Sequence, residues 1–145
     1  MAEILLLWLL VINVGLGGIW AFMGHTFAVW EVAESIGWPA GNPFQTEVAV
    51  ANLAIGTLGI LCYWIRDNFW TTTVIATSVW LLGAAVIHLM EIMSAGNYNP
   101  GNAGLIFYMD IIGPLILIAL LVYVRLVGRR EREPADTEQP TGQPL

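Results

Sequence analysis

The sequence contains no lysine, and only 11% of its 145 residues are charged. An ordinary soluble domain has about 25% charged residues, so a chain with 57% hydrophobic residues is too apolar for a soluble core of this size. The single cysteine, Cys62, excludes an internal disulfide and any CxxC metal or haem-attachment motif. We interpret Cys62 as a small packing residue near a helix end. The net charge of −6 argues against nucleic acid as a partner.

Long apolar runs predict an all-α integral membrane protein whose main partner is the lipid bilayer. A membrane-crossing helix needs about 20 apolar residues, and four segments reach that length, roughly 4–29, 43–65, 69–93 and 104–127. We therefore expect residues 1–128 to form a four-helix transmembrane bundle and the polar segment 129–145 to form a disordered cytoplasmic tail. The first segment is preceded by Glu3 and no basic residue, which favours a retained helix over a signal peptide.

The positions of the arginines predict the orientation of these helices. Arg66 lies in the turn between the second and third segments, and the other four arginines follow residue 124. The two remaining loops, about 30–42 and 94–103, contain no basic residue. By the positive-inside rule both termini lie in the cytoplasm of a multi-pass cell-membrane protein. Interfacial aromatics are expected near the Arg66 turn and in the first outer loop: Tyr63, Trp64, Phe69 and Trp70 inside, Trp30 and Trp38 outside.

The first outer loop carries signals of local structure. In "VWEVAESIGW" apolar residues at 29, 32, 33 and 36 indicate a short helix on the outer membrane surface. The following "GNPFQ" predicts the start of the second span, with Asn42 as N-cap, Pro43 at the first helical position and Gln45 completing a capping box. In "SAGNYNPGNAG" three Asn and three Gly suggest a structured cap, with Asn102 as N-cap of the fourth span.

Ionisable residues of all four spans fall at one depth. Counting about 1.5 Å of rise per residue, each lies one to two turns from the outer end of its helix: His25, Glu47, His88, Glu91 and Asp110. Such groups are costly in lipid and are kept where they pair, bind a ligand or line water. With Asn52 they form the candidate polar site, and close helix packing is expected at Gly17, Ala21 and Ala84 and along Asn52, Gly56 and Gly59.

The blocks "GHTFAVWEVAESIGWPAGNPFQTEVAVANLAIGTLGIL" and "GNYNPGNAG" also support the four-span interpretation. Over about residues 15–120 the chain resembles a family of small four-span prokaryotic membrane proteins known only as a domain of unknown function. The resemblance implies the helical fold and no activity.

Several functions remain open for the polar site, and no catalytic residue or enzyme activity is assigned. A metal site would use His25, Glu47, His88, Glu91 and Asp110, because imidazole with carboxylates suits iron, zinc or manganese. A haem between His25 and His88 is disfavoured, since their depths differ by about one turn and acids surround them. Three alternatives are left open. The first is a metal-binding or redox-related protein, and the second is a structural or accessory subunit, in a homo-oligomer or a membrane complex. The third is a small-ligand, quinone or proton-handling protein.

Overall fold

The computed structural model describes residues 1–130, and these residues form helices without any strand. The elements in chain order are α1 (Ala2–Trp8), η1 (Leu9–Leu16), α2 (Gly17–Phe27), α3 (Val29–Ile36), α4 (Pro43–Leu61), α5 (Asn68–Ala95), α6 (Pro100–Ala103) and α7 (Leu105–Arg130). Four helical segments of this part of the chain are long and apolar enough to cross a membrane. The predicted all-α membrane bundle is therefore confirmed. The predicted tail, 129–145, lies almost wholly outside the described residues.

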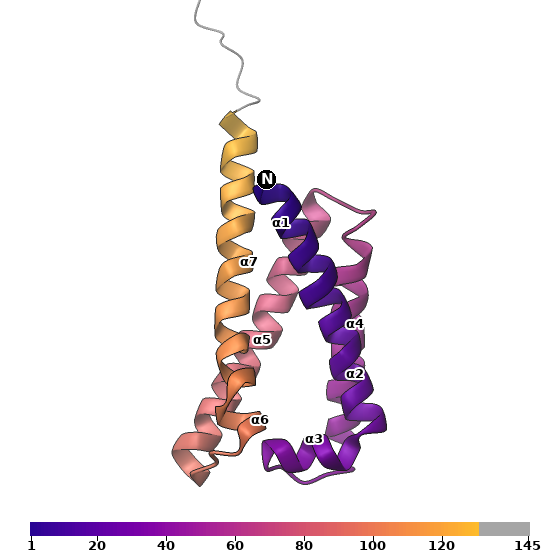
Figure 1. Cartoon of the computed structure of the whole chain (residues 1–145), viewed down its shortest axis with the longest axis vertical. Coiled ribbons are helices and arrows are strands. Elements are labelled where there is room, and N and C mark those ends of the chain that lie inside the picture. Colours follow the sequence, from indigo (N-terminus) through magenta and orange to yellow (C-terminus); the bar gives the residue numbers. More distant parts are fainter. Residues whose placement is uncertain (131–145) are drawn as a thin grey trace, which may run out of the picture.

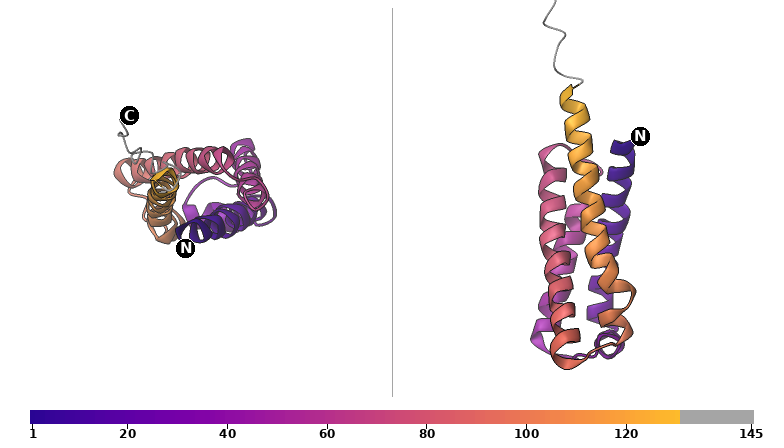
Figure 2. Two further views of the ribbon diagram at one scale, coloured as in Figure 1. Left: turned by 90° about the horizontal axis from the view of Figure 1, so that it is seen from above. Right: turned by 90° about the vertical axis from the view of Figure 1, so that its left-hand side faces the viewer.

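The four long segments run side by side around a common axis, as Figure 1 and Figure 2 show. One end, called the terminal end here, carries the N-terminus, the turn between α4 and α5, and the last turns of α7. The other end, the capped end, carries α3 and α6, which lie across the mouth of the bundle and contact each other. Along the bundle α2 packs against α4, and α5 packs against α7. The two helix pairs are thus joined at the capped end by short connecting elements.

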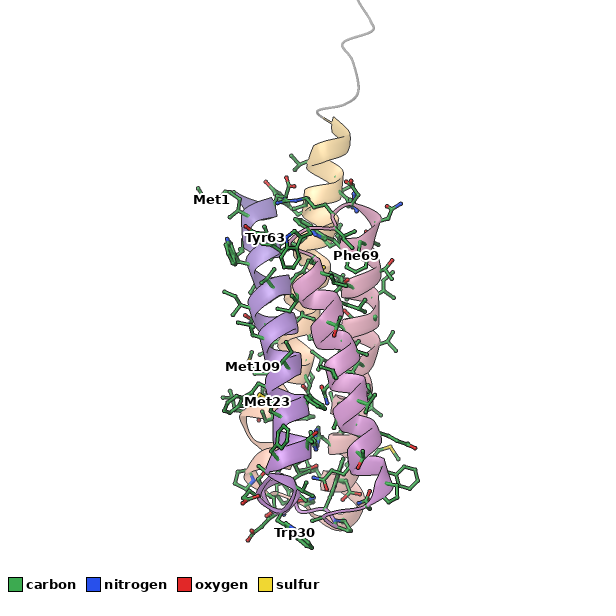
Figure 3. The ribbon with its side chains drawn as sticks, turned by 90° about the vertical axis from the view of Figure 1, so that its right-hand side faces the viewer. Met1, Met23, Trp30, Tyr63, Phe69 and Met109 are labelled. Atoms are coloured by element: carbon green, nitrogen blue, oxygen red, sulfur yellow. The ribbon has the colours of Figure 1, made fainter. Side chains whose placement is uncertain are left out.

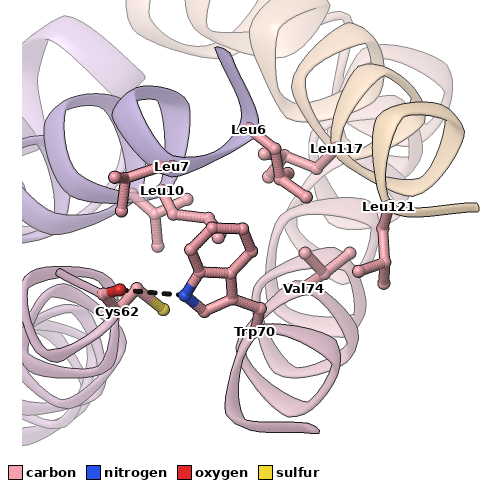
Figure 4. Packing of buried hydrophobic residues seen from close by; sticks show 9 residues of the cluster. Leu6, Leu7, Leu10, Cys62, Trp70, Val74, Leu117 and Leu121 are labelled. Carbon is pink, nitrogen blue, oxygen red and sulfur yellow. Dashed lines mark hydrogen bonds between the residues drawn. The ribbon is translucent and has the colours of Figure 1, made fainter. Parts of the chain in front are cut away.

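A hydrophobic core fills the terminal end. Leu6 and Leu10 from the first segment meet Val74 from α5 and Leu117 from α7, and all four side chains are buried. In Figure 4 the indole of Trp70 lies within this cluster and donates a hydrogen bond of 2.8 Å from Nε1 to the carbonyl of Cys62. Burying the aromatic ring requires this partner for its N–H group.

This core settles two expectations about residues near the Arg66 turn. Cys62 is buried at the end of α4, as expected. The assignment of Trp70 to an interfacial belt was wrong, because the residue is only 4% exposed. Tyr63 and Trp64 are exposed, and Figure 3 shows Tyr63 and Phe69 at the same end of the bundle as Met1.

Glycines let the first and second spans approach closely. A Cβ atom on Gly18 would lie 2.7 Å from the Cα of Gly56, and one on Gly59 would lie 2.7 Å from the Cα of Gly15. The stripe predicted on the second span is therefore confirmed, but Gly17 faces no other helix. The face that meets α4 is formed by Gly15 and Gly18 instead, because successive residues of a helix point about 100° apart and the spacing of small residues does not tell which face meets a neighbour.

The start of α4 forms largely as its sequence predicts. The Asn42 side chain accepts a hydrogen bond from the Gln45 N–H at 3.0 Å, and Pro43 occupies the first turn. The Gln45 side chain reaches back to the N–H of Gly41 instead of Asn42, and its amide donates to the carbonyl of Val29 at the start of α3. Gln45 thus fastens α3 to the second span. The predicted short helix of the first outer loop is present as α3.

Candidate functional site

The centre of the candidate site is a buried pair formed by His88 of α5 and Asp110 of α7. His88 Nε2 lies 3.8 Å from Asp110 Oδ2, and the two side chains are 8% and 12% exposed. Asp110 begins an inward-facing row on α7 that continues through Pro114, Leu117 and Leu121, one helical turn apart. Because α5 and α7 pack along each other, the inward faces of the two helices bring the imidazole and the carboxyl together.

Asn102 determines which ring nitrogen of His88 carries a proton. The Asn102 amide nitrogen donates to two carbonyls, that of Asn97 at 2.8 Å and that of His88 at 3.3 Å. These bonds leave the Asn102 Oδ1 as the acceptor facing His88 Nδ1, 2.7 Å away. A side-chain amide oxygen cannot donate, so Nδ1 must carry a hydrogen. The remaining nitrogen, Nε2, is therefore the one with a free lone pair in the neutral ring, and it faces Asp110.

The pair can hold one proton in two ways. A neutral His88 with a protonated Asp110 and a cationic His88 with an ionised Asp110 both contain a single proton between Nε2 and the carboxyl oxygen. Both states are neutral as a pair, which avoids the cost of an isolated charge among apolar side chains. The site is thus suited to storing a proton between two groups that are shielded from solvent.

A network of asparagines fixes this arrangement at the capped end. Asn97 donates a hydrogen bond of 2.9 Å to the carbonyl of Ile36, the last residue of α3. Its own side-chain oxygen accepts from the backbone and the side chain of Asn99. Gly37, which follows α3 with φ of +83°, lies so close to these asparagines that a side chain there would collide with them. The loop before α6 is therefore tied to α3 on one side and to His88 on the other.

Trp38 covers one face of the His88 imidazole. Its ring stacks on the imidazole of His88 with centroids 5.6 Å apart and an interplanar angle of 19°. Trp38 is half-buried, and its predicted place at the outer membrane surface stays a prediction. The same indole also lines a cavity between α2, α3 and α4 that contains His25. Trp38 thus adjoins both the pair and the cavity that His25 lines.

The other predicted site residues lie apart from the pair. Glu47 is exposed on the outer side of α4. Glu91 is half-buried and forms no ion pair with any described residue. Asn52 accepts a hydrogen bond of 3.2 Å from Trp80 Nε1 and thereby links α4 to α5.

These positions bear directly on the predicted metal site. Among residues 1–130 no group of three or more His, Cys, Asp or Glu side chains is arranged to hold a metal ion. The ligand set of His25, Glu47, His88, Glu91 and Asp110 is therefore not assembled here. Of these five side chains the structure brings His88 and Asp110 together.

Sequence reasoning missed the role of the asparagine loop. Asn102 was expected to cap the fourth span, whereas it lies within α6 and is fully buried against His88. Asn97 was not singled out at all. Three asparagines and three glycines in so short a loop were the available signal, because such side chains form hydrogen bonds within tight turns.

Comparison with known proteins gives one match. A family model described as "Family of unknown function (DUF6790)" matches residues 1–130, which confirms the resemblance found in the sequence. No curated protein and no solved structure matches the chain.

Proposed function

Because the chain belongs to DUF6790, a family of unknown function, we propose its function from its own geometry: it is a proton-handling membrane protein. Its working groups are His88 and Asp110, which hold one exchangeable proton at the capped end. The observation that carries this proposal is the bond between His88 Nδ1 and Asn102 Oδ1, which leaves Nε2 directed at Asp110. Ionisable groups inside membrane helices commonly mark proton relays.

Asn102 is what distinguishes this arrangement from an incidental ion pair. If the imidazole could rotate freely, either nitrogen could take the proton and the carboxyl would not be its fixed partner. Here the Asn102 amide nitrogen donates hydrogen bonds to two carbonyls, so only the amide oxygen is left to face the ring. The exchange of a proton is therefore restricted to the Nε2 side, within reach of Asp110 by a small movement of either side chain.

A second candidate function is supported by the same loop. Asn97 and Asn102 connect α3, α5 and α6 through hydrogen bonds, so the polar cluster also suits a structural clasp in an accessory subunit. In that case the proton on the pair would be permanent and would not follow the pH of the medium. The two functions differ in whether Asp110 changes its protonation state.

Infrared spectroscopy of the purified protein in lipid nanodiscs tests this difference. We expect a carboxylic-acid C=O band that changes with pH and disappears in Asp110→Asn. His88→Gln should shift the band, because the amide replaces the ring that faces the carboxyl, and Glu47→Gln serves as the matched control on the exposed side of α4. If no pH-dependent band is lost in Asp110→Asn, proton handling is refuted and the structural clasp is favoured.

We also propose that the capped end faces the outside of the cell and both termini face the cytoplasm. Arg66 and Arg125 support this orientation, because both lie at the terminal end, where Arg66 approaches Glu3 and Arg125 approaches Asp67. No described residue of the capped end is Lys or Arg, in keeping with the positive-inside rule.

Labelling of single cysteines with an impermeant maleimide in intact cells tests the orientation. A cysteine at the exposed position Ala95 should label, and one at the exposed position Asn68 should label only after the membrane is opened. The unaltered protein is the control, since its buried Cys62 should remain unlabelled in both conditions. Labelling of the Asn68 position in intact cells would contradict the proposed orientation.

A further inference from the structure

A second site lies beside the proton pair, in a cavity of about 200 Å³ between α2, α3 and α4. Its walls are largely apolar and include Ile36, Trp38, Phe44 and Val48. Drug-sized ligands occupy about 300–1,000 Å³, so this cavity suits a single ring or a short acyl segment. Phe44 at its edge is 76% exposed and belongs to a span that faces lipid, so an apolar molecule could enter from the membrane.

The polar groups around the cavity are almost all used within the protein. The Gln45 amide donates to the Val29 carbonyl, and its oxygen accepts from the Gly41 N–H. Asn42 uses its side chain on the N–H of Gln45 and on the Pro39 carbonyl. Two side chains that line the cavity form no hydrogen bond with the described residues, His25 and Trp38, and of these the imidazole of His25 is the more polar group.

The surroundings of His25 determine what its imidazole can offer. Its Nδ1 is buried and has no hydrogen-bond partner among the described residues. A buried N–H without an acceptor is rarer and more costly than an acceptor without a donor, so the proton resides on Nε2. His25 therefore presents an N–H donor at Nε2 and can satisfy an acceptor oxygen of a ligand.

The lining also restricts the charge of the ligand. Among the described residues that line the cavity there is no Asp, Glu, Lys or Arg, and a charged ligand would have no counter-ion in these apolar surroundings. A neutral molecule that presents a carbonyl oxygen on an apolar body matches the walls, the His25 donor and the volume.

We propose that this cavity binds the carbonyl-bearing headgroup of a neutral membrane-soluble molecule, with its oxygen accepting a hydrogen bond from His25 Nε2. Two sources share this chemistry: the ring of a lipid-soluble quinone and the ester group of a diacylglycerol. The quinone ring suits the small volume better, since a diacylglycerol could place only one ester and part of one chain inside. Through Trp38 the bound molecule would lie one aromatic ring away from His88.

The test uses the full chain in detergent with histidine labelled by ¹⁵N, because the sequence has only two histidines. The probes are a decyl-substituted benzoquinone and a short-chain diacylglycerol, each titrated by calorimetry and by the ¹⁵N signals of the two rings. We expect saturable quinone binding that shifts the His25 signal more than the His88 signal. His25→Phe keeps a ring and removes the donor, and it should weaken binding about ten-fold, the effect of one hydrogen bond.

Two further variants keep the proposal falsifiable if His25→Phe fails to fold. Val48→Trp fills the cavity and should abolish binding, whereas Glu47→Gln alters the neighbouring exposed residue of α4 and should bind as the wild type does. Diacylglycerol binding with the same dependence on His25 and Val48 would support the site and assign it to a lipid ester. Absence of saturable binding by both probes, or binding unaffected by His25→Phe and Val48→Trp, would overturn the proposal. The Asp110 infrared band is independent of either result.

Discussion

Replacing Asn102 by Ala should be the most damaging single change in the asparagine loop. The substitution removes three hydrogen bonds, to His88 Nδ1, to the His88 carbonyl and to the Asn97 carbonyl. Interhelical hydrogen bonds in membrane proteins contribute about 0.6 kcal/mol on average and up to about 1.7 kcal/mol. Three such bonds give a loss of about 2 kcal/mol, with an upper bound of about 5 kcal/mol.

Asn99→Ala is the matched control within the same loop. Its side chain is exposed and donates one hydrogen bond, to Asn97 Oδ1, so its removal should cost about 0.6 kcal/mol or less. Asn102→Asp is a second variant of nearly the same shape. It keeps an acceptor for His88 Nδ1 but replaces the donor to both carbonyls by an oxygen, so it should destabilise at least as much as Asn102→Ala.

The free energy of unfolding can be measured by titrating the protein from a mild detergent into dodecyl sulfate and following its helical signal. Near-equal losses for Asn102→Ala and Asn99→Ala would refute the inference that Asn102 fixes His88. The ¹⁵N spectrum of His88 gives a second criterion. In Asn102→Ala the proton should no longer be confined to Nδ1, and a spectrum unchanged from wild type would contradict the derived tautomer.

Two further substitutions test packing elsewhere in the bundle. Gly18→Val should separate α2 from α4, because its Cβ would meet the backbone of Gly56, and it should destabilise the fold by about 2 kcal/mol or more, as overpacked cores do. Gly17→Ala is the control and should be nearly neutral, because Gly17 meets no other helix. Equal effects of the two variants in the unfolding titration would contradict the assignment of Gly18 to the contact face. Thr77→Val removes a buried hydroxyl without a partner in the described residues, so stability should be unchanged or higher. Thr73→Val is its control and should lower the free energy of unfolding, because the Thr73 hydroxyl donates to the Phe69 carbonyl and contacts Cys62. A larger loss of stability for Thr77→Val than for Thr73→Val would show that the Thr77 hydroxyl has a hydrogen-bond partner.

The sequence by itself determined the features that depend on neighbouring residues. Runs of apolar residues predict the four spans, because a helix in lipid must satisfy its own backbone and present apolar side chains. Asn42 and Pro43 start α4 as expected, since capping involves only residues within one turn. The depth of His88 and Asp110 could also be counted along the chain, because each residue of a helix adds a fixed rise.

Only the tertiary structure decided which of these residues meet. The direction of a side chain around its helix depends on how that helix rotates and packs, and this is set by contacts between distant segments. The first span illustrates this: Gly18 and not Gly17 meets α4, although both glycines were visible in the sequence. For the same reason His88 faces Asp110 and Asn102, whereas Glu47, at a similar depth, faces outward.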